Sequence, residues 1–394
     1  MSASATFDRH YLSRTFWSSP EIHLAASPHH TLPPQHLLET AKPHLPEGGC
    51  LFLTSGTTGA PKWVALEKRA FLHSAKVVNA HYGLTREDRW LLALPLHHVG
   101  GFSILARACL TESEVSQAPA KWQVDDFVAS LTASESTVTS LVPTQVHDLV
   151  TAQVRPPSRL RLVLVGGGRI SPALLRDALN LGWPVCATFG MTEAASQIAS
   201  QPLEHDRFES PDTLEVLPHW HLTTDAEDIL TLQGPSLAKG YLVVYEGGTL
   251  WEPIDPTIGL KTRDRVKLLQ DGARTFLNFL SRHENVVKIN GELVSLEPLE
   301  ERLAAILPRC CPPFALAALP DARRENRIVL VIESQAPAPD ESVAGALAEH
   351  NTACAPHERI DSIRLLPKLP RTELGKLARS RLSDYLGHQS GSSA

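Results

Sequence analysis

The sequence lacks the features that mark disulfide-rich, metal-stapled or nucleic-acid-binding proteins. Its six cysteines form no C-x-x-C pair and show no metal-ligand spacing, which indicates reduced, mostly buried thiols. Thiols of this kind fit a reducing cytoplasm. Lys and Arg total 37 against 43 Asp and Glu, so no basic surplus indicates a nucleic-acid partner. Local groups must therefore neutralise the phosphates of any bound nucleotide.

Long apolar segments are also missing. No uninterrupted apolar stretch is long enough to cross a bilayer. The first residues, MSASATFDRHYLSR, lack the basic segment and apolar core of a secretory signal. Hydrophobic residues make up 43% of the chain and charged residues 20%, which is typical of a globular protein. We expect a cytoplasmic protein without membrane insertion, with two or three domains in its 394 residues.

Short apolar segments that end in glycine or proline recur along the first part of the chain. Leu160–Val165 runs into three glycines, and Ser171 with Pro172 supplies the N-cap and first turn of a helix through Leu179. Further strands are expected at Leu51–Leu53, at Val138–Val142 before a helix that begins after Pro143, and at Pro184–Phe189. This alternation predicts an α/β fold with a largely parallel sheet.

The pattern changes near residue 280. Leu296, Leu299, Leu303 and Ile306 share one helix face, and Ile328–Ile332 is a short apolar strand that precedes a Pro-rich loop at 334–342. A small α+β domain of about 110 residues is large enough to be independent. We therefore expect a large domain over residues 1–280 and a C-terminal domain over residues 281–394.

The most informative segment is the string TSGTTGAPK, which follows the first expected strand. Its candidate phosphate-binding residues are Thr54, Ser55, Gly56, Thr57, Thr58, Gly59 and Lys62. Glycines let the backbone approach a polyphosphate, and hydroxyls, N–H groups and the lysine ammonium can bind it. The hydrolase P-loop is excluded, because Pro61 separates the last glycine from Lys62 and Trp63 follows. Taken alone, the segment also fits a flexible polar turn.

This nine-residue string resembles the signature of the adenylate-forming superfamily, which includes acyl-CoA synthetases, luciferases and peptide-synthetase adenylation domains. Further segments resemble that superfamily's motifs in the same order. They are Leu94–Gly101, Gly166–Gly168, Phe189–Glu193, Gln233–Pro235 with Lys239–Tyr241, Thr262–Asp264, Ser281–Glu292 and Pro370–Lys376. Each alone has an ordinary reading as an exposed histidine pair, a turn, a solvated acid or a surface lysine. Because all of them occur in the superfamily's order along the chain, membership of the superfamily is favoured over these separate ordinary interpretations.

The resemblance implies an ATP site in the large domain. Beyond the phosphate loop, it assigns nucleotide binding to Gly167, Gly168, Phe189, Gly190, Thr192, Asp264 and Arg282. Within this set, Asp264 is expected to bind the ribose hydroxyls and Arg282 the ribose or phosphate. Glu193 is expected to hold Mg²⁺, a hard cation that prefers carboxylate and phosphate oxygens. The Gly-Pro and Gly-Tyr segment is expected to be largely structural.

The resemblance also implies three catalytic positions. Lys376 would bridge the acyl carboxylate and the phosphate, Lys288 lies on the segment that faces the site during thioester formation, and His98 would gate the acyl pocket. Glu284 falls at the pivot on which the C-terminal domain would turn. The implied fold is a large α/β domain with mixed, largely parallel sheets and a small α+β domain on a hinge.

Four features depart from the superfamily pattern. Phe189 stands where many relatives have Tyr, and Arg263 and Ser281 each replace a glycine. Only 53 residues precede Thr54. The large domain is therefore expected to be shortened at its N-terminus, and a homodimer is one way to complete its cover. Segments such as Lys261–Asp264 look most like the o-succinylbenzoate–CoA ligase branch of menaquinone biosynthesis.

The implied activity is that of an AMP-forming acid–CoA ligase. Its cofactors and substrates would be ATP, Mg²⁺, a small carboxylic acid and coenzyme A. Two alternatives remain open on the sequence. An adenylation enzyme could load a carrier-protein thiol in place of coenzyme A, or a non-catalytic protein could only bind nucleotide.

Overall fold

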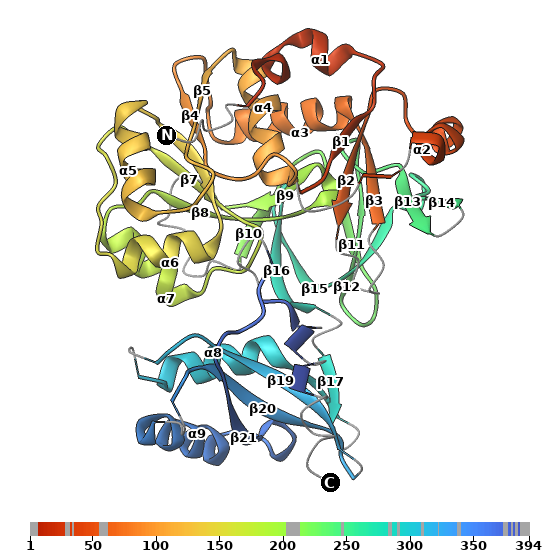
Figure 1. The fold of residues 1–394 in the computed structure, drawn as a ribbon. Coiled ribbons are helices and arrows are strands. Elements are labelled where there is room, and N and C mark those ends of the chain that lie inside the picture. The colour runs from red at the N-terminus through yellow and green to blue at the C-terminus, as the bar shows by residue number, and fades with distance from the viewer. Residues whose placement is uncertain are drawn as a thin grey trace. The chain divides into compact units, whose positions relative to one another are not determined.

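The protein is represented by a computed structural model that describes residues 7–27, 32–33, 35–54, 62–201, 213–245, 248–282, 286–289, 292–308, 311–321, 323–336, 340–372, 377–379, 381–382 and 385–386. The chain folds into two compact units (Figure 1). The first comprises Met1–Ala226, Leu230–Thr262 and Lys267–Asn278. The second comprises Glu227–Ile229, Arg263–Val266 and Phe279–Ala394.

Two sheets organise the first unit. The smaller has the order β1-β2-β3-β13-β14, with strands at His23–Ala25, Gly49–Thr54, Lys62–Glu67, Gly240–Tyr245 and Gly248–Pro253. The larger has the order β11-β12-β15-β16-β10-β9-β8-β7-β6-β4-β5. In chain order its strands are β4 (Arg89–Leu92), β5 (Glu114–Gln117), β6 (Val138–Leu141), β7 (Leu162–Val165), β8 (Val185–Met191), β9 (Ser196–Ser200), β10 (Thr213–Val216), β11 (His221–Thr224), β12 (Ile229–Gln233), β15 (Leu260–Asp271) and β16 (Arg274–Arg282).

The expected strand-and-helix alternation is confirmed in one half of the larger sheet. Strands β5, β4, β6, β7 and β8 pair in parallel, whereas β8 pairs with β9 and β9 with β10 in antiparallel fashion. The sheet is therefore mixed. The two prolines that predicted helix starts stand at the first positions of α6 (Pro143–Thr151) and α7 (Pro172–Asn180). Proline suits that position because its missing N–H would have no intrahelical partner.

Helices α3 (Lys68–His81) and α4 (Val99–Thr111) pack against each other and contact strands of both sheets. Helix α3 contacts β3 of the smaller sheet and β9 of the larger one. An aromatic cluster fills the space beside them, because the Phe102 ring lies 5.2 Å from Phe71, 5.3 Å from Phe52 and 5.4 Å from Trp17. Each aromatic side chain buries a large apolar area, so the cluster joins α1 to the core.

The remaining short elements of the first unit connect these layers. They are η1 (Arg9–Leu12), α1 (Arg14–Ser18), α2 (Gln35–Ala41), η2 (Lys42–His44), α5 (Val124–Ala133) and η3 (Thr192–Ala194). In Figure 1, α5, α6 and α7 lie together beside β7 and β8.

The second unit is a small α+β body. Its elements are β17 (Val286–Ile289), β18 (Glu292–Ser295), α8 (Leu296–Ile306), β19 (Phe314–Asp321), β20 (Glu325–Glu333), α9 (Glu341–Ala353), η6 (Pro356–Glu358) and β21 (Ile360–Leu366). Strand β20 lies between antiparallel β19 and parallel β21. The expected helix face is confirmed, since Leu296, Leu299 and Leu303 are buried in one core cluster with strand β20 and Ile306 packs against that cluster.

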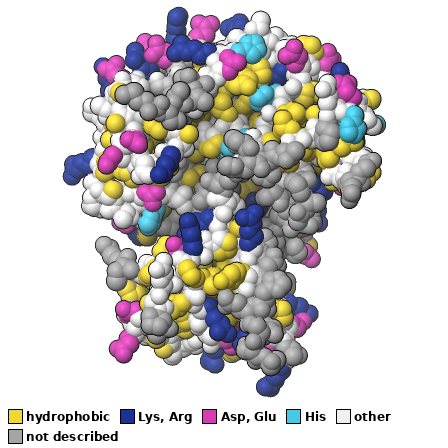
Figure 2. Space-filling model, in the orientation of Figure 1, with side chains coloured by type: hydrophobic (Ala, Val, Ile, Leu, Met, Phe, Trp, Pro, Cys, Tyr) yellow, Lys and Arg dark blue, Asp and Glu magenta, His cyan; other side chains and the backbone are white. Residues whose placement is uncertain are grey.

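Along the upper rim of the first unit in Figure 2, Lys and Arg side chains are mixed with Asp and Glu side chains. Among the helices that the structure describes, none combines the length and apolarity that a bilayer crossing requires.

Candidate active site

The expected phosphate loop connects two paired strand ends. Thr54 ends β2, Lys62 begins β3, and the two residues face each other in the antiparallel register. The Thr54 hydroxyl donates to the Lys62 carbonyl oxygen at 3.2 Å. The hairpin therefore fixes both ends of the loop. Its central candidates, Ser55, Gly56, Thr57, Thr58 and Gly59, lie outside the described residues.

The Lys62 side chain lies over the smaller sheet. Its Nζ donates to Glu252 Oε2 at 2.7 Å and sits 5.5 Å from the centroid of the Tyr241 ring. Glu252 and Tyr241 are cross-strand partners on β14 and β13, so both groups come from the same point of the sheet. A cation near an aromatic face and a carboxylate is electrostatically stabilised.

Glu193 lies close to the same tyrosine. The Tyr241 hydroxyl donates to Glu193 Oε1 at 3.2 Å, and the Ala238 amide donates to the Glu193 carbonyl oxygen at 2.7 Å. Glu193 belongs to the short turn η3, together with Thr192, and both residues are half-buried. The expected metal ligand and the expected phosphate-loop lysine are thus joined through one aromatic side chain.

The turn that carries Thr192 and Glu193 is tightly built. A Cβ atom on Gly190 would lie 1.7 Å from the Ser196 carbonyl oxygen, so only glycine fits at that position. After the turn, Ala195 has φ 49° and Ser196 has φ 107°, backbone conformations that non-glycine residues rarely adopt. Such backbone geometry persists where the surroundings determine it strongly, and it clusters at functional sites.

The expected adenine loop follows a strand next to the Glu193 segment. Val165 at the end of β7 pairs with Ala187 of β8, so Gly166–Gly168 and Phe189 both lie beyond the last parallel pair of these neighbouring strands. Thr188 donates from its hydroxyl to the Val165 carbonyl oxygen at 3.1 Å. Gly167 has φ 75°, which requires the conformational freedom of glycine. Open α/β sheets bind ligands at this end of their strands.

Buried Arg107 of α4 holds the segment after Glu193 from the other side. Its Nη2 donates to Gln197 Oε1 at 2.6 Å and reaches Ser196 Oγ at 3.5 Å. Burial lowers the Arg107 pKa to about 10. Among the described residues no carboxylate pairs with it, and a buried charge without such a partner is costly. The guanidinium therefore depends on Gln197 and on the Trp90 ring, whose centroid is 5.8 Å from its carbon.

His98 stands at the N-cap of α4. Its carbonyl oxygen accepts hydrogen bonds from the amides of Gly101 and Phe102, and its ring centroid lies 4.4 Å from that of His97. A Cβ on Gly101 would meet the Pro95 carbonyl oxygen at 2.4 Å, so glycine permits the sharp turn into the helix. These contacts fix the His98 backbone at the start of α4. The gating role of its side chain stays a prediction.

Two expected site residues meet within the second unit. Arg282 Nε lies 3.1 Å from Asp264 Oδ1, and the Asp264 side chain is only 5% exposed. Lys288 instead pairs with Glu325 at 3.2 Å. Lys376, Glu284 and Gly291 lie outside the described residues.

The donor set fits a magnesium ion that is shared with a nucleotide. Among the described residues there is no group of three or more His, Cys, Asp or Glu that could hold a metal by itself. Mg²⁺ commonly takes one or two carboxylates together with substrate phosphates and water. A single carboxylate at Glu193, which accepts a hydrogen bond from the Tyr241 hydroxyl, meets that requirement.

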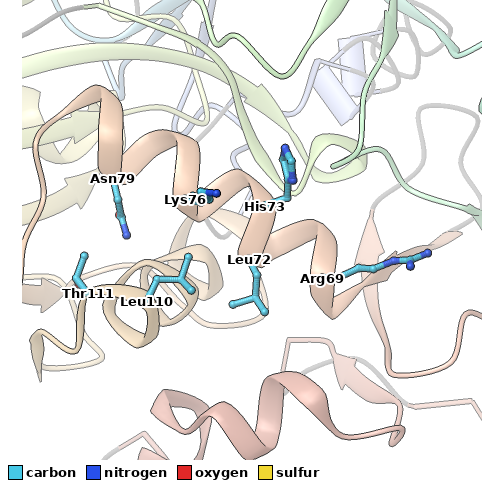
Figure 3. Close-up of a pocket in the computed structure, with 7 residues that line it drawn as sticks. All are labelled: Arg69, Leu72, His73, Lys76, Asn79, Leu110 and Thr111. Atoms are coloured by element: carbon cyan, nitrogen blue, oxygen red, sulfur yellow. The ribbon is translucent and has the colours of Figure 1, made fainter.

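A separate open cavity of about 520 Å³ lies between α3 and α4 (Figure 3). It is lined by Arg69, Leu72, His73, Lys76, Asn79, Leu110 and Thr111. The Asn79 side chain points toward Thr111 and Leu110, and Arg69 lies at the far end of the helix. Arg69 is paired with Glu67 at 2.6 Å. None of the motif residues lines this cavity, so it is distinct from the candidate site.

Comparison with known families gives a match over residues 25–242 to the model of AMP-binding enzymes. The chain belongs to the AMP-binding enzyme family. The matched region contains the phosphate hairpin, the glycine loop, the turn with Glu193, and Tyr241. It ends before Asp264 and Arg282.

Relatives within this family match between half and most of the chain. A 2-succinylbenzoate–CoA ligase of Bacillus pumilus is 29% identical over 349 residues, which is 84% of this chain and 68% of that protein. The 2-succinylbenzoate–CoA ligases of Bacillus licheniformis and Bacillus velezensis are 31% identical over 215 residues and 29% identical over 270 residues. These matches cover 50% and 66% of this chain and 43% and 54% of the relatives' own length. The chain thus covers about two thirds or less of these proteins.

Solved structures show the same fold. An o-succinylbenzoate CoA synthetase from Bacillus subtilis, in complex with the acyl-adenylate intermediate OSB-AMP, is 27% identical with a TM-score of 0.73. The match covers 85% of this chain and 69% of that one. The same synthetase in complex with ATP and magnesium ion is 26% identical, with a TM-score of 0.70 over 84% of this chain and 69% of that one. The predicted α/β large domain and small C-terminal domain are confirmed by this likeness.

The motifs single out Lys62 and Glu193 as candidates but do not indicate the groups that contact them. Tyr241 was expected to be largely structural, and Glu252 was not singled out. The Gly-Tyr motif could have drawn attention to Tyr241. Nothing in the sequence pattern indicated Glu252, because its contact depends on the pairing of β13 with β14.

Proposed function

We propose that the protein is an AMP-forming acid–CoA ligase that activates o-succinylbenzoate with ATP and transfers the acyl group to coenzyme A in menaquinone biosynthesis. The observation that carries this proposal is the convergence of Lys62 and Glu193 on Tyr241. These residues were expected independently to bind polyphosphate and magnesium. The relatives named 2-succinylbenzoate–CoA ligase support the choice of acid.

In the first half-reaction, the acid's carboxylate attacks the α-phosphorus of ATP and pyrophosphate leaves. Lys62 and the phosphate loop offset the negative charge of the polyphosphate, which is electrostatic stabilisation by a site built in advance. Glu193 is the residue that would hold Mg²⁺, which when bound neutralises phosphate charge. Gly167, Gly168, Phe189 and Gly190 would surround the adenine, and Thr192 would contact the phosphate.

The remaining expected residues complete the proposal. Asp264 and Arg282 would bind the ribose, and Lys376 would orient the two negatively charged reactants. In the second half-reaction the coenzyme A thiolate attacks the acyl-adenylate and AMP leaves, with Lys288 facing the thiol and His98 gating the acyl pocket. We propose a domain boundary after residue 280 and a turn about Glu284 between the half-reactions.

The cytoplasm is the proposed location, because the cysteines that the structure describes are free thiols.

Exchange of labelled pyrophosphate into ATP tests the activity directly. We expect exchange that depends on o-succinylbenzoate and Mg²⁺, followed by acyl-CoA and AMP formation when coenzyme A is added. If exchange depended on another acid, that acid would replace o-succinylbenzoate as the proposed substrate. Exchange without transfer to coenzyme A would favour a carrier-protein acceptor. Absence of exchange with every acid tested, alongside tight ATP binding, would favour the non-catalytic alternative.

The Lys376→Ala variant tests the assignment of the half-reactions. Adenylation should slow by about a hundredfold or more, because one positioned cation is lost from the transition state. Conversion of pre-formed acyl-adenylate and coenzyme A to thioester should be nearly unaffected. Adenylation at the wild-type rate would contradict the role of Lys376.

A further inference from the structure

We propose that Tyr241 is a positioning residue that sets the Mg²⁺ affinity of the nucleotide site by fixing the carboxylate of Glu193. This inference rests on the proposed function, since it assumes that Glu193 holds the ion. It concerns a residue for which the motifs indicated only a structural role.

The segment around Tyr241 holds Glu193 at two points. The Tyr241 hydroxyl donates to the carboxylate at 3.2 Å. Three residues earlier, the Ala238 amide donates to the Glu193 carbonyl oxygen at 2.7 Å. Backbone and side chain of the acid are therefore oriented by one stretch of chain.

Tyr241 is itself rigidly placed. Its strand β13 is hydrogen-bonded on both sides, with Tyr241 opposite Val64 of β3 and opposite Glu252 of β14. The preceding residue allows a close approach of these strands, because a Cβ on Gly240 would lie 2.4 Å from the Glu252 carbonyl oxygen. A hydroxyl on such a frame can direct a carboxylate with little loss of side-chain freedom on binding.

The contact of the Tyr241 ring and that of its hydroxyl can be separated chemically. The ring faces the Lys62 ammonium, which Glu252 also holds, whereas the hydroxyl donates to Glu193. Phenylalanine keeps the ring and removes the hydroxyl. Loss of a hydrogen-bond partner of a metal-ligating side chain typically weakens metal binding by about 10–100-fold.

The test is Tyr241→Phe in the full chain, with Tyr245→Phe as the matched control. Tyr245 lies on the same strand, is 56% exposed and loses the same atom. Each variant is titrated in two ways. The first measures the rise in melting temperature that a non-hydrolysable ATP analogue causes at increasing Mg²⁺ concentration. The second measures Mn²⁺ binding by electron paramagnetic resonance. We expect Tyr241→Phe to need about tenfold more metal in both titrations. At saturating metal its affinity for the analogue should equal that of the wild type, and Tyr245→Phe should match the wild type throughout.

A Tyr241→Phe variant with the wild-type metal dependence would overturn the inference. Weaker analogue binding at every metal concentration would overturn it too, because the effect would then act through Lys62 or the fold. If the wild type itself bound the analogue without any metal dependence, the proposed function would fail together with the inference. The titration of the wild type therefore comes first, because it tests the proposed function independently of the variants.

Discussion

Lys68 is a buried side chain that is held by neutral oxygen atoms. Its Nζ donates to the Ser19 hydroxyl and to the Glu21 carbonyl oxygen, each at 2.8 Å, and to the Ser19 carbonyl oxygen at 3.2 Å. The ammonium also lies 4.5 Å from the centroid of the Phe16 ring. Burial lowers the Lys68 pKa. These contacts tie the chain before β1 to the first turn of α3.

His23 is a half-buried titratable group near Lys68. Its ring stacks on Phe102 at 5.1 Å, and burial, together with the nearby Lys68 charge, lowers the His23 pKa from 6.5 to about 4. The folded protein thus keeps His23 neutral where an unfolded chain would protonate it, so acid favours unfolding.

Acid should therefore destabilise the first unit as the pH falls from 6.5 toward 4. Allowing for partial exposure of the ring, the loss from His23 should be about 1–2 kcal/mol. His23→Phe should remove that part of the pH dependence, as measured by urea unfolding at several pH values. Some dependence should remain, since burial also lowers the His219 pKa to about 4. A variant as acid-sensitive as the wild type would contradict this assignment.

For single residues, the sequence indicated which side chains are candidates for binding, but not which side chains contact them. Lys62, Glu193 and Asp264 are candidates because their residue types and neighbours match motifs. The partners Glu252, Tyr241 and Arg107 contact the site through strand pairing and helix packing between distant segments. Those contacts depend on register and burial, which no local pattern specifies.

Among the elements, the β8–β9 hairpin constrains the site most directly. Gly190→Ala would force a methyl group onto the Ser196 carbonyl oxygen, which lies at 1.7 Å from the ideal Cβ position. Either the bulge between Phe189 and Gly190 must open or Glu193 must move. We expect a loss of about 3 kcal/mol in unfolding free energy and a large fall in pyrophosphate exchange. Wild-type stability and exchange in this variant, by denaturant titration and the exchange assay, would disprove the constraint.

Elements with strong local signals were predicted well. The strands before Gly166 and Gly190 and the helices that begin at Pro143 and Pro172 are present with small changes in their ends. The arrangement of the smaller sheet was not predicted. Its strand β13 pairs with β3 across a long stretch of chain, and hydrophobic patterns do not identify partners at such separations.

Across the whole molecule, a substitution that stabilises one compact unit should raise the unfolding temperature of that unit and leave that of the other unchanged. Gly345 lies inside α9 of the second unit, and a Cβ there would meet nothing within 4 Å. Gly345→Ala should stabilise that unit by about 0.5–1 kcal/mol, because alanine restricts the unfolded chain and favours the helix. Calorimetry should show one transition moved to higher temperature and the other unchanged.

The control for that variant is Gly272→Ala in the first unit. Its surroundings are equally open, but its φ of 59° is unfavourable for alanine. We expect Gly272→Ala to lower the unfolding free energy of the first unit by about 1 kcal/mol. Only the calorimetric transition of that unit should move. If both substitutions moved the same transition in opposite directions, the units would not unfold independently.

The change in sequence character near residue 280 predicted a small α+β domain. The chain from Phe279 onward belongs to the second unit, together with Glu227–Ile229 and Arg263–Val266. Those two inner segments could not have been assigned from sequence, because they adjoin or lie within strands β12 and β15 of the larger sheet.

The position of Tyr241 between an ammonium and a carboxylate also makes the site observable. The chain has only five tyrosines, so biosynthetic incorporation of 3-fluorotyrosine would give a fluorine spectrum simple enough to assign with single substitutions. The resonance of a fluorine on that ring depends on the charges beside it. Arrival of a polyphosphate, and later its departure, would each be visible as a change of frequency during turnover.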